Sequence, residues 1–359
     1  MICSMQIKSR SPKAKLMSLY FLSWIYKSIT SFRNLLFNYI KICTSSVPCM
    51  VISVGNITTG GTGKTPLTIF LASSLRDKGY TVAILSRGYL RNTSGTVLVS
   101  KGNGPICSWE ECGDEAYMIA NHTSSLPIVV DNKRIRGAKY LLTMFSPDII
   151  VLDDGFQHRS ISRDLDILLI NGSDKLDDHR LLPLGKLRES WHNAKRSDIL
   201  IITKRNPAIN IAEKIKYLNK PTFRTKSKNY ISNACNVVID SVEKNENVFV
   251  FSGIADPSTF LAEVKDYGFS IVGFKTYPDH YRYRKKDMAS LNRKAKESGA
   301  DFMITTDKDW VKIISFEPSY KILAMGISVE LENNAEFFKL VESKSKSVTS
   351  PKQTQRQQK

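Results

Sequence analysis

Residues 54–66 read Val-Gly-Asn-Ile-Thr-Thr-Gly-Gly-Thr-Gly-Lys-Thr-Pro, and the fold class can be inferred from this stretch. Apolar, β-branched residues precede it at positions 50–54 and predict a short buried strand, whereas residues 66–78 carry apolar side chains at helical spacing. A strand, a glycine-rich loop and a helix in this order form a P-loop, because backbone N–H groups of the loop and of the helix N-terminus point at phosphate oxygens. We therefore expect a phosphate-binding loop that ends in Gly63-Lys64-Thr65.

The polar groups at the end of this loop have expected roles. Lys64 can reach the β- and γ-phosphates of a nucleotide, and the Thr65 hydroxyl can ligate Mg²⁺. The strict pattern has a glycine five residues before Gly63, where this chain has Thr58, so the glycines at positions 60 and 61 supply the flexibility instead. The residues expected to hold the nucleotide are Gly60, Gly61, Thr62, Gly63, Lys64, Thr65 and Pro66.

An apolar run at residues 148–152 leads directly into two carboxylates, Asp153 and Asp154. Acids at the carboxyl end of a strand beside a P-loop hold Mg²⁺ or its water. Adjacent side chains on a regular strand point to opposite faces, so both acids face the metal only if the chain turns there, which Gly155 allows. The alternative is a solvated acidic turn.

Short apolar segments alternate with helical ones along most of the chain, which is typical of an α/β fold. The segments at 81–85, 127–130, 148–152, 166–170 and 198–202 predict a P-loop NTPase-like parallel sheet with helices on both faces. A second alternation, over residues 248–325, predicts a smaller α/β domain. The expected divisions are a basic, amphipathic N-terminal segment (1–46), a P-loop domain (47–205), a linker region (206–245), the smaller α/β domain (246–342) and a basic disordered tail (343–359).

Positive charge is concentrated at the two ends of the chain. Lys and Arg number 52 against 34 Asp and Glu, a net charge of +18 that favours anionic partners. Residues 1–48 hold seven basic side chains and no acidic one, and residues 344–359 hold five. A nucleic-acid groove more often concentrates its charge in the folded body. None of the six cysteines forms a C-x-x-C pair, so we expect reduced thiols rather than a zinc site or a disulfide scaffold.

The N-terminal segment combines basic side chains with an apolar run at residues 16–26. Eleven uncharged residues are too few to span a bilayer, which takes about 20. Aromatic side chains, Trp24 and Phe21 among them, with scattered Lys and Arg are typical of a helix that lies in a membrane interface. The alternative is a helix packed on the protein's own body.

Further motifs are weak when each is taken alone. Asp114 and Glu115 precede a helical stretch and have the sequence of helix caps. His280, in Pro278-Asp-His280, is a lone histidine in a predicted loop, and such a residue is usually structural or solvated. Arg87 follows a predicted strand, and Arg188 follows Leu181-Leu-Pro-Leu-Gly-Lys-Leu; both are candidates for phosphate binding or for solvated loops.

In this order, the motifs resemble one family, the tetraacyldisaccharide 4′-kinases of Gram-negative lipid A biosynthesis. The resemblance covers about residues 47–312, and Thr58 in the P-loop belongs to the family pattern. Asp307 stands where the family more often has Glu, and Ser190 stands where Pro is common. The motifs that carry the resemblance are Val54–Pro66, Ser86–Tyr89, Gly113–Glu115, Asp153–His158, Leu181–Glu189, Phe251–Pro257, Pro278–His280 and Thr306–Asp309.

The resemblance implies transfer of the γ-phosphate of ATP, with Mg²⁺, to the 4′-hydroxyl of tetraacyldisaccharide 1-phosphate, which forms lipid IVA. It implies work at a membrane surface, the cytoplasmic face of the inner membrane, with neither nucleic acid nor an obligate protein partner. The implied roles are Asp114 as general base with His280 assisting it and Lys64 on the nucleotide, Arg87, Glu115, Gln157 and Arg188 in the substrate site, and Thr65, Asp153 and Asp154 on the metal.

Three other functions remain open from the sequence. The first is a P-loop ATPase or a kinase of a soluble metabolite. The second is a basic nucleic-acid-binding protein without ATP turnover, and the third is a family member that binds ATP but has lost phosphate transfer.

Overall fold

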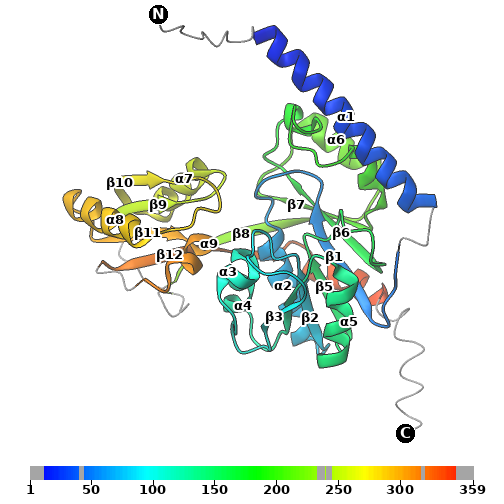
Figure 1. Ribbon diagram of the computed structural model, residues 1–359. Helices are drawn as coiled ribbons and strands as arrows, with labels where there is room; N and C mark the ends of the chain where they lie inside the picture. Colours follow the sequence, from blue (N-terminus) through cyan, green and yellow to red (C-terminus); the bar gives the residue numbers. More distant parts are fainter. Residues whose placement is uncertain (1–11, 40–43, 233–238, 240–244, 317–319, 345–359) are drawn as a thin grey trace, which may run out of the picture.

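The computed structural model describes residues 12–39, 44–232, 239, 245–316 and 320–344, and one long sheet runs through it (Figure 1). From edge to edge, its strands are β10 (Ser270–Thr276), β9 (Asn247–Ser252), β11 (Phe302–Thr306), β12 (Ile322–Leu331), β8 (Thr222–Ser232), β7 (Ile199–Thr203), β6 (Leu165–Asn171), β1 (Met50–Asn56), β5 (Ile149–Asp153), β2 (Val82–Ser86), β4 (Ile128–Val130) and β3 (Val97–Ser100). The helices are α1 (Pro12–Tyr39), α2 (Lys64–Asp77), α3 (Trp109–Cys112), α4 (Asp114–His122), α5 (Arg134–Phe145), α6 (Ile209–Leu218), α7 (Pro257–Tyr267), α8 (Lys285–Glu297) and α9 (Asp307–Ile313), with 3₁₀ helices η2 (Leu176–His179) and η3 (Trp191–Arg196).

The strand that precedes the P-loop lies in the middle of the larger unit. β1 pairs in parallel with β5 on one side and β6 on the other, and β2, β4 and β7 extend the parallel arrangement. The edge strand β3 runs antiparallel to its neighbour β4. Parallel strands end at one edge of a sheet, so the loops after β1, β2, β4 and β5 gather there and form the natural place for a ligand.

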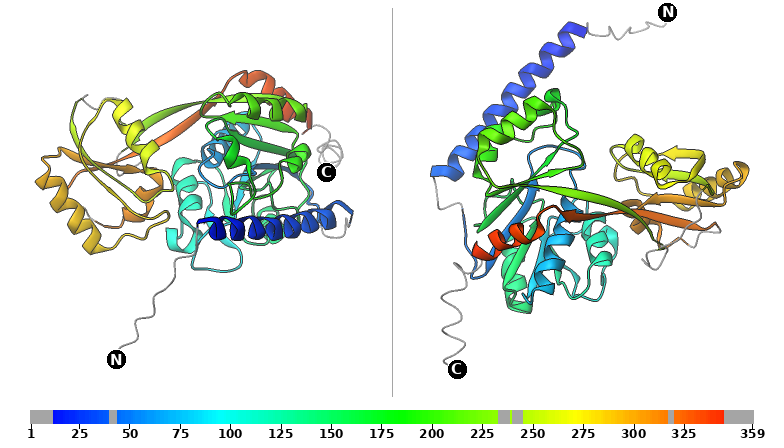
Figure 2. Two further views of the ribbon diagram at one scale, coloured as in Figure 1. Left: turned by 90° about the horizontal axis from the view of Figure 1, so that it is seen from above. Right: turned by 180° about the vertical axis from the view of Figure 1, so that it is seen from behind.

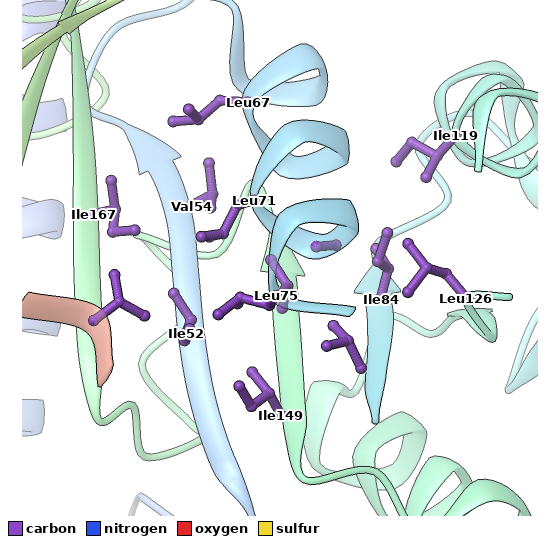
Figure 3. Close-up of a cluster of buried hydrophobic side chains, with 14 of the residues drawn as sticks. Ile52, Val54, Leu67, Leu71, Leu75, Ile84, Ile119, Leu126, Ile149 and Ile167 are labelled. Carbon is purple, nitrogen blue, oxygen red and sulfur yellow. The ribbon is translucent and has the colours of Figure 1, made fainter. Parts of the chain in front are cut away.

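Helices cover both faces of the larger unit, as the alternation predicts. Ile52 and Val54 of β1 pack in one cluster with α2 and α4 (Figure 3), whereas Val51 faces the opposite side and packs with α5. All seven residues of β1 are buried, because both faces of the strand are covered. Pro66 lies in the first turn of α2, where a missing backbone N–H costs no helical hydrogen bond.

Two long strands connect the larger unit to the smaller one (Figures 1 and 2). The start of β8 pairs in parallel with β7, and the rest of it pairs antiparallel with β12 from Thr225 to Ser232. β12 in turn begins beside β11 of the smaller unit. Since each strand belongs to both units, this ribbon sets how they lie relative to one another.

The smaller unit is itself α/β, with β9, β10 and β11 in parallel and α7 and α8 packed on them. The structure therefore confirms the predicted fold class. The region 206–245, expected to be an irregular linker, instead contains α6, which packs on the larger unit, and β8. Residues 233–238 and 240–244 lie outside the described residues.

The end of the chain also differs from expectation. Residues 334–344 form a helix, and its buried side chains Phe337, Phe338 and Val341 join the cluster around α2. The segment after β12 thus packs on the larger unit, although the sequence assigned it to the smaller domain through residue 342. Its apolar spacing was the signal for this helix. The expected tail falls almost wholly on residues 345–359, which lie outside the described residues.

The N-terminal helix α1 lies along the larger unit (Figures 1 and 2). Polar side chains attach it there: Ser23 Oγ donates to the Leu181 carbonyl at 3.2 Å, and Tyr26 Oη donates to the Arg188 carbonyl at 2.7 Å. Among the described residues, none of the helices combines the length and hydropathy needed to cross a bilayer. The large apolar side chains of α1 that are exposed are Leu16, Met17, Tyr20, Phe21, Leu22, Trp24, Ile29, Phe32, Leu35 and Tyr39.

Candidate active site

The P-loop leaves β1 at Asn56 and enters α2 at Lys64. Gly60 and Gly63 have φ angles of +102° and +79°, which favour glycine. The side-chain amide of Asn56 donates to Thr62 Oγ1 at 2.8 Å and so braces the loop from inside. A Cβ atom added at Gly60 would meet nothing within 4 Å, so the outer side of the loop is open to a ligand.

A second segment, residues 181–189, lies against this loop. The Thr59 backbone N–H donates to the Lys186 carbonyl at 2.8 Å, and the Arg188 backbone N–H donates to the Ile57 carbonyl at 2.7 Å. Through these two backbone hydrogen bonds, the segment 181–189 holds Arg188 beside the P-loop. The structure places the Arg188 guanidinium beside the P-loop, in contact with Asp154.

Asp153 ends β5 and is buried, at 1% exposure. Its two carboxylate oxygens accept from Thr68 Oγ1 of α2 and Ser86 Oγ of β2, each at 3.2 Å. Burial, together with the negative charges of Glu115 and Asp154, raises the pKa of Asp153. Three carboxyl groups, those of Asp153, Asp154 and Glu115, therefore influence one another at the end of β5.

Asp154 has a φ of +50°, so the turn begins one residue before the glycine that suggested it. The turn separates the two side chains and directs that of Asp154 to the cations of the P-loop region. Arg188 Nη1 donates to its Oδ2 at 2.9 Å, and Lys64 Nζ lies 3.7 Å from its Oδ1. Burial alone would raise the pKa of Asp154, but the charges of Lys64 and Arg188 outweigh it and lower the pKa.

These side chains fit a magnesium ion. Mg²⁺ prefers carboxylate and hydroxyl oxygens and keeps several waters, so it needs few protein ligands. Asp153, Asp154 and the hydroxyl of Thr65 supply oxygen atoms of this kind. In the described part of the chain, no three His, Cys, Asp or Glu side chains converge on a metal site.

The structure brings Asp114 and His280 together although 166 residues separate them. Asp114 is the first residue of α4 in the larger unit, and His280 lies in the loop between β10 and α8 of the smaller one. His280 Nδ1 lies 2.8 Å from Asp114 Oδ2. The other oxygen of Asp114 accepts the Glu115 backbone N–H at 2.9 Å, so the carboxylate is fixed and each oxygen keeps a lone pair.

Gly253 and the buried Asp309 hold the loop that carries His280. The His280 backbone N–H donates to the Gly253 carbonyl at 3.1 Å, and the Gly253 N–H donates to Asp309 Oδ2 at 2.7 Å. A Cβ at Gly253 would approach the Pro278 carbonyl oxygen to 3.1 Å, which explains the glycine. The Phe251–Pro257 and Thr306–Asp309 motifs thus act by positioning the Pro278–His280 motif.

Two lysines of α9 surround the Asp114–His280 pair. Lys312 is buried, with Nζ 2.9 Å from Asp309 Oδ1 and 3.7 Å from Asp114 Oδ2. Lys308 Nζ lies 3.1 Å from Glu115 Oε1. Burial alone would raise the pKa of Asp114, but the hydrogen bond from His280 and the charges of Lys308 and Lys312 outweigh it and lower the pKa. Asp114 is therefore a buried yet ionised carboxylate.

Several basic groups lie close enough to His158 to affect its pKa. Arg134 at the start of α5 is fully buried, and Arg87 directly follows β2. Burial and the charges of Arg134 and Arg87 lower the pKa of His158 to about 4. Within the described chain, no hydrogen-bond partner reaches Nε of Arg134, Nε2 of His158, or Nε and Nη2 of Arg33. The unpartnered guanidinium N–H groups of Arg134 and Arg33 are suited to an anion.

The side chain of Gln157 supports the start of the P-loop. Its amide nitrogen donates to the Asn56 carbonyl at 2.7 Å and to Glu189 Oε1 at 2.9 Å, so both of its N–H groups are used. Glu189 is buried and also binds Arg196, with both Nη–Oε distances at 2.8 Å, and Asn34 of α1 at 3.2 Å. A network thus runs from α1 through Glu189 to the base of the P-loop.

A small cavity of about 80 Å³ adjoins the Asp114–His280 pair. Tyr89, Leu90, Trp109 and Arg282 line it, and the Tyr89 ring meets the His280 ring edge-on at 5.4 Å. The pair is thus reached from an opening with aromatic walls.

Four residues at this site had no role in the sequence-based interpretation: Arg134, Glu189, Lys308 and Lys312. Glu189 and Lys308 lie inside quoted motifs, which was a usable signal. Arg134 begins a helix that local pattern did not single out, and nothing in the sequence indicates that Lys312 is buried.

A family model described as tetraacyldisaccharide-1-P 4′-kinase matches residues 16–346. The chain belongs to this family. Tetraacyldisaccharide 4′-kinase of Desulfotalea psychrophila is 38% identical over 306 residues, which cover 82% of this chain and 87% of that protein. The enzyme of the same name from Aquifex aeolicus is 36% identical over 326 residues, which cover 89% of this chain and 96% of that protein.

The fold of this tetraacyldisaccharide-1-P 4′-kinase family member also matches a solved structure. The "apo" form of LpxK from Aquifex aeolicus, in complex with ATP, superposes with a TM-score of 0.75 at 33% identity, over 91% of this chain and 98% of that one. The similarity therefore extends over both units and the ribbon between them.

Proposed function

We propose that this chain transfers the γ-phosphate of ATP to the 4′-hydroxyl of tetraacyldisaccharide 1-phosphate, which gives lipid IVA and ADP. The observation that carries the proposal is the buried, ionised Asp114 paired with His280 beside the carboxyl edge of a P-loop sheet, in a chain of this family. The charge of Glu115 reaches Asp153, so the pair and the acid end of β5 share one site.

Asp114 acts as the general base. As the bond between the 4′-oxygen and the γ-phosphorus forms and the bond from that phosphorus to the β-phosphate oxygen breaks, Asp114 accepts the hydroxyl proton and ADP leaves. Phosphoryl transfer depends mainly on positioning and charge neutralisation, so a fixed carboxylate within hydrogen-bond reach is sufficient as the base. His280 holds this carboxylate in place through its 2.8 Å contact.

Lys64 and Arg188 neutralise the transferred phosphate. Both now bind Asp154, so they are already fixed at the mouth of the P-loop before a nucleotide arrives. Such preorganised cations stabilise negative charge that develops in the transition state. Asp153, Asp154 and Thr65 would hold Mg²⁺, which supplies further positive charge on the phosphate oxygens when it is bound.

The remaining predicted residues serve the acceptor in this proposal. Arg87, with Arg134 behind it, supplies positive charge for an anionic group of the substrate. Glu115 lies on the acceptor side of Asp114, where Lys308 fixes it. Both N–H groups of Gln157 are used to support the P-loop and to bind Glu189. Its side-chain carbonyl oxygen is the atom that can accept a hydrogen bond from the substrate.

The helix α1 binds the cytoplasmic surface of the inner membrane in this proposal. Its inward stripe is polar, with Ser23, Thr30 and Asn34 buried, whereas its outward side carries exposed large apolar side chains. A water-facing helix normally has the opposite arrangement. An apolar outer face suits the headgroup–acyl boundary, where an acylated substrate resides.

The test is transfer of labelled phosphate from ATP in detergent micelles. Tetraacyldisaccharide 1-phosphate is compared with the same disaccharide after deacylation and with no acceptor. We expect product only with the acylated acceptor and little ATP hydrolysis without it. Equal use of the deacylated sugar would indicate a kinase of soluble metabolites, and acceptor-independent hydrolysis would indicate an ATPase.

A further inference from the structure

Two cysteines lie at the two ends of the short helix α3. Ser108 is the N-cap of this helix, and its backbone N–H donates to Glu111 Oε2 at 2.8 Å, as in a capping box. In such a box, the residue before the cap commonly packs against the fourth residue of the helix. These two positions are occupied by Cys107 and Cys112. The capping geometry therefore brings two thiol groups together.

The packing of the two cysteines agrees with this placement. Cys112 is fully buried in the cluster around α2 and α4, and Cys107, which is half-buried, packs against the same cluster. Cys112 Sγ lies 3.2 Å from the Ser108 carbonyl oxygen, so this sulfur points back toward the start of the helix. The thiol groups of Cys107 and Cys112 are hydrogen-bonded to one another. The pair thus consists of one partly exposed cysteine and one buried cysteine.

We propose that Cys107 and Cys112 form a modification site, which a small disulfide such as glutathione disulfide oxidises reversibly to an intramolecular disulfide that slows phosphate transfer. The Cys107 thiolate attacks one sulfur of the reagent, which forms a mixed disulfide and releases one thiolate. Cys112 then loses its proton and attacks the Cys107 sulfur, which forms the bond between the two cysteines and releases the second thiolate. The protein gives up two electrons and two protons, and the reagent leaves as two thiols.

The two cysteines differ in reactivity in the way that this order requires. The thiolate is the attacking species, so a lower pKa and partial exposure both favour attack. The hydrogen bond with Cys112 lowers the pKa of Cys107, although burial and the charge of Glu111 oppose this effect. The same hydrogen bond, together with burial, raises the pKa of Cys112. Cys107 is therefore the attacking thiol, and Cys112 is the thiol that closes the disulfide.

The backbone between Cys112 and the proposed base, Asp114, is tightly packed. A Cβ atom added to Gly88 would lie 2.8 Å from the Cys112 carbonyl oxygen, and one added to Gly113 would lie 2.8 Å from the Tyr89 carbonyl oxygen. A disulfide holds its two sulfur atoms about 2.05 Å apart, which is much closer than a hydrogen bond does. Oxidation therefore draws Cys112 toward its partner, and the packed backbone transmits this movement to Asp114.

The helix between the two cysteines also faces the active site. Trp109, the first residue of α3, lines the cavity beside Asp114, and the guanidinium carbon of Arg282 lies 5.6 Å from the centre of its ring. Arg282 belongs to the smaller unit and donates to the Leu90 carbonyl at 3.1 Å and to Asn92 Oδ1 at 2.9 Å. A movement of α3 thus affects a contact between the two units as well. The slowing of transfer rests on the proposed function, whereas the formation of the disulfide does not.

The first experiment identifies the disulfide by mass spectrometry. The reduced, full-length protein is equilibrated with glutathione and glutathione disulfide at pH 7.5, alkylated under denaturing conditions and digested with trypsin. Residues 102–133 form one tryptic peptide that holds Cys107, Cys112 and no other cysteine. We expect this peptide to be lighter by two hydrogen atoms and to carry no alkyl group. A stable glutathione adduct, two alkylated thiols, or pairing with a cysteine outside this peptide would each overturn the proposal.

Three variants assign the roles of the two thiols. In Cys112→Ala, the glutathione adduct on Cys107 should accumulate, because no second thiol displaces it. In Cys107→Ser, Cys112 should stay reduced and be alkylated. Cys49→Ala is the matched control, since Cys49 is buried, at 3% exposure, in a different cluster, and it should form the disulfide as the wild type does. An adduct on Cys112 in Cys107→Ser that forms as fast as the wild-type disulfide would overturn the assigned order.

The second experiment compares phosphate transfer by reduced, oxidised and re-reduced protein in detergent micelles. We expect oxidation to lower kcat about 10- to 100-fold, because small displacements of a catalytic group have effects of this size, and dithiothreitol to restore it. Cys107→Ser should keep the activity of the reduced wild type and lose the response to glutathione disulfide. Full activity of the oxidised wild type, or an equal loss in Cys107→Ser, would overturn the regulatory role. If the disulfide forms but the reduced protein transfers no phosphate, the proposed function fails and the modification site stands.

Discussion

Replacing Glu189 with Ala removes the centre of the network that joins α1 to the P-loop. Glu189 is fully buried and accepts from Arg196 twice at 2.8 Å, from Gln157 at 2.9 Å and from Asn34 at 3.2 Å. The substitution leaves the Arg196 guanidinium, whose side chain is 18% exposed, without its counter-charge. Breaking a buried ion pair on one side costs about 3–5 kcal/mol, so we expect a loss of that size in the free energy of unfolding.

The loss should depend on pH in a defined direction. Burial alone would raise the pKa of Glu189, but the hydrogen bonds from Arg196 and Gln157 outweigh it and lower the pKa. Stabilisation from a carboxylate with a depressed pKa is fully present above its unfolded-state pKa, about 4.3, and is lost as the pH falls through its folded-state pKa. The difference between wild type and Glu189→Ala should therefore shrink below about pH 4.

Thermal unfolding at pH 7 measures the effect. At about 2–4 °C per kcal/mol for units of this size, Glu189→Ala should lower Tm by roughly 6–20 °C. Glu297→Ala, which breaks an ion pair to Arg293 with both side chains more than 60% exposed, is the control and should cost less than about 1 kcal/mol. Equal, small losses in both variants would refute the account of the Glu189 network.

Lys64→Met should lower kcat roughly 100- to 1,000-fold, because it removes a preorganised cation from the transferred phosphate, and turnover near that of wild type would contradict the P-loop role. Replacing Phe21 and Trp24 together with Ser should weaken binding to anionic lipid vesicles more than about tenfold, because each buried aromatic side chain contributes on the order of 1.5–3 kcal/mol. Phe274→Ser, an exposed aromatic of β10, is the matched control in the sedimentation assay; unchanged binding by the α1 variant would exclude the interfacial role of that face.

The parts of the site that local pattern predicts are those made by contiguous residues. The P-loop, the strand before it and the Asp153–Asp154 turn each lie within a few residues, so spacing and residue type suffice to predict them. The structure adds one refinement there, since the turn begins at Asp154 itself. The parallel strands β1, β2, β4, β5, β6 and β7 were also predicted, because strands buried on both faces are continuous apolar runs. The edge strand β3, which is only partly buried, was not predicted.

The Asp114–His280 pair could not be derived from spacing. Its geometry depends on the ribbon formed by β8 and β12. The exposed residues Lys226 and Lys228 give β8 a polar composition, so the local pattern did not predict a strand there. The geometry depends also on α9, where Lys312 is only 1% exposed although lysines in short helices are usually solvated. Resemblance to a family supplied the pairing, and the contact between two units explains it physically.

The most direct test of the central claim is a single-turnover measurement of phosphate transfer with wild type and Asp114→Asn. Enzyme in excess over labelled ATP, with saturating tetraacyldisaccharide 1-phosphate, reports the transfer step apart from product release, and equilibrium binding gives the ATP affinity. We predict that Asp114→Asn lowers the transfer rate about 10²- to 10⁴-fold and leaves ATP binding unchanged. A transfer rate within about threefold of wild type, or a loss confined to ATP affinity, would contradict the role of Asp114 as the base.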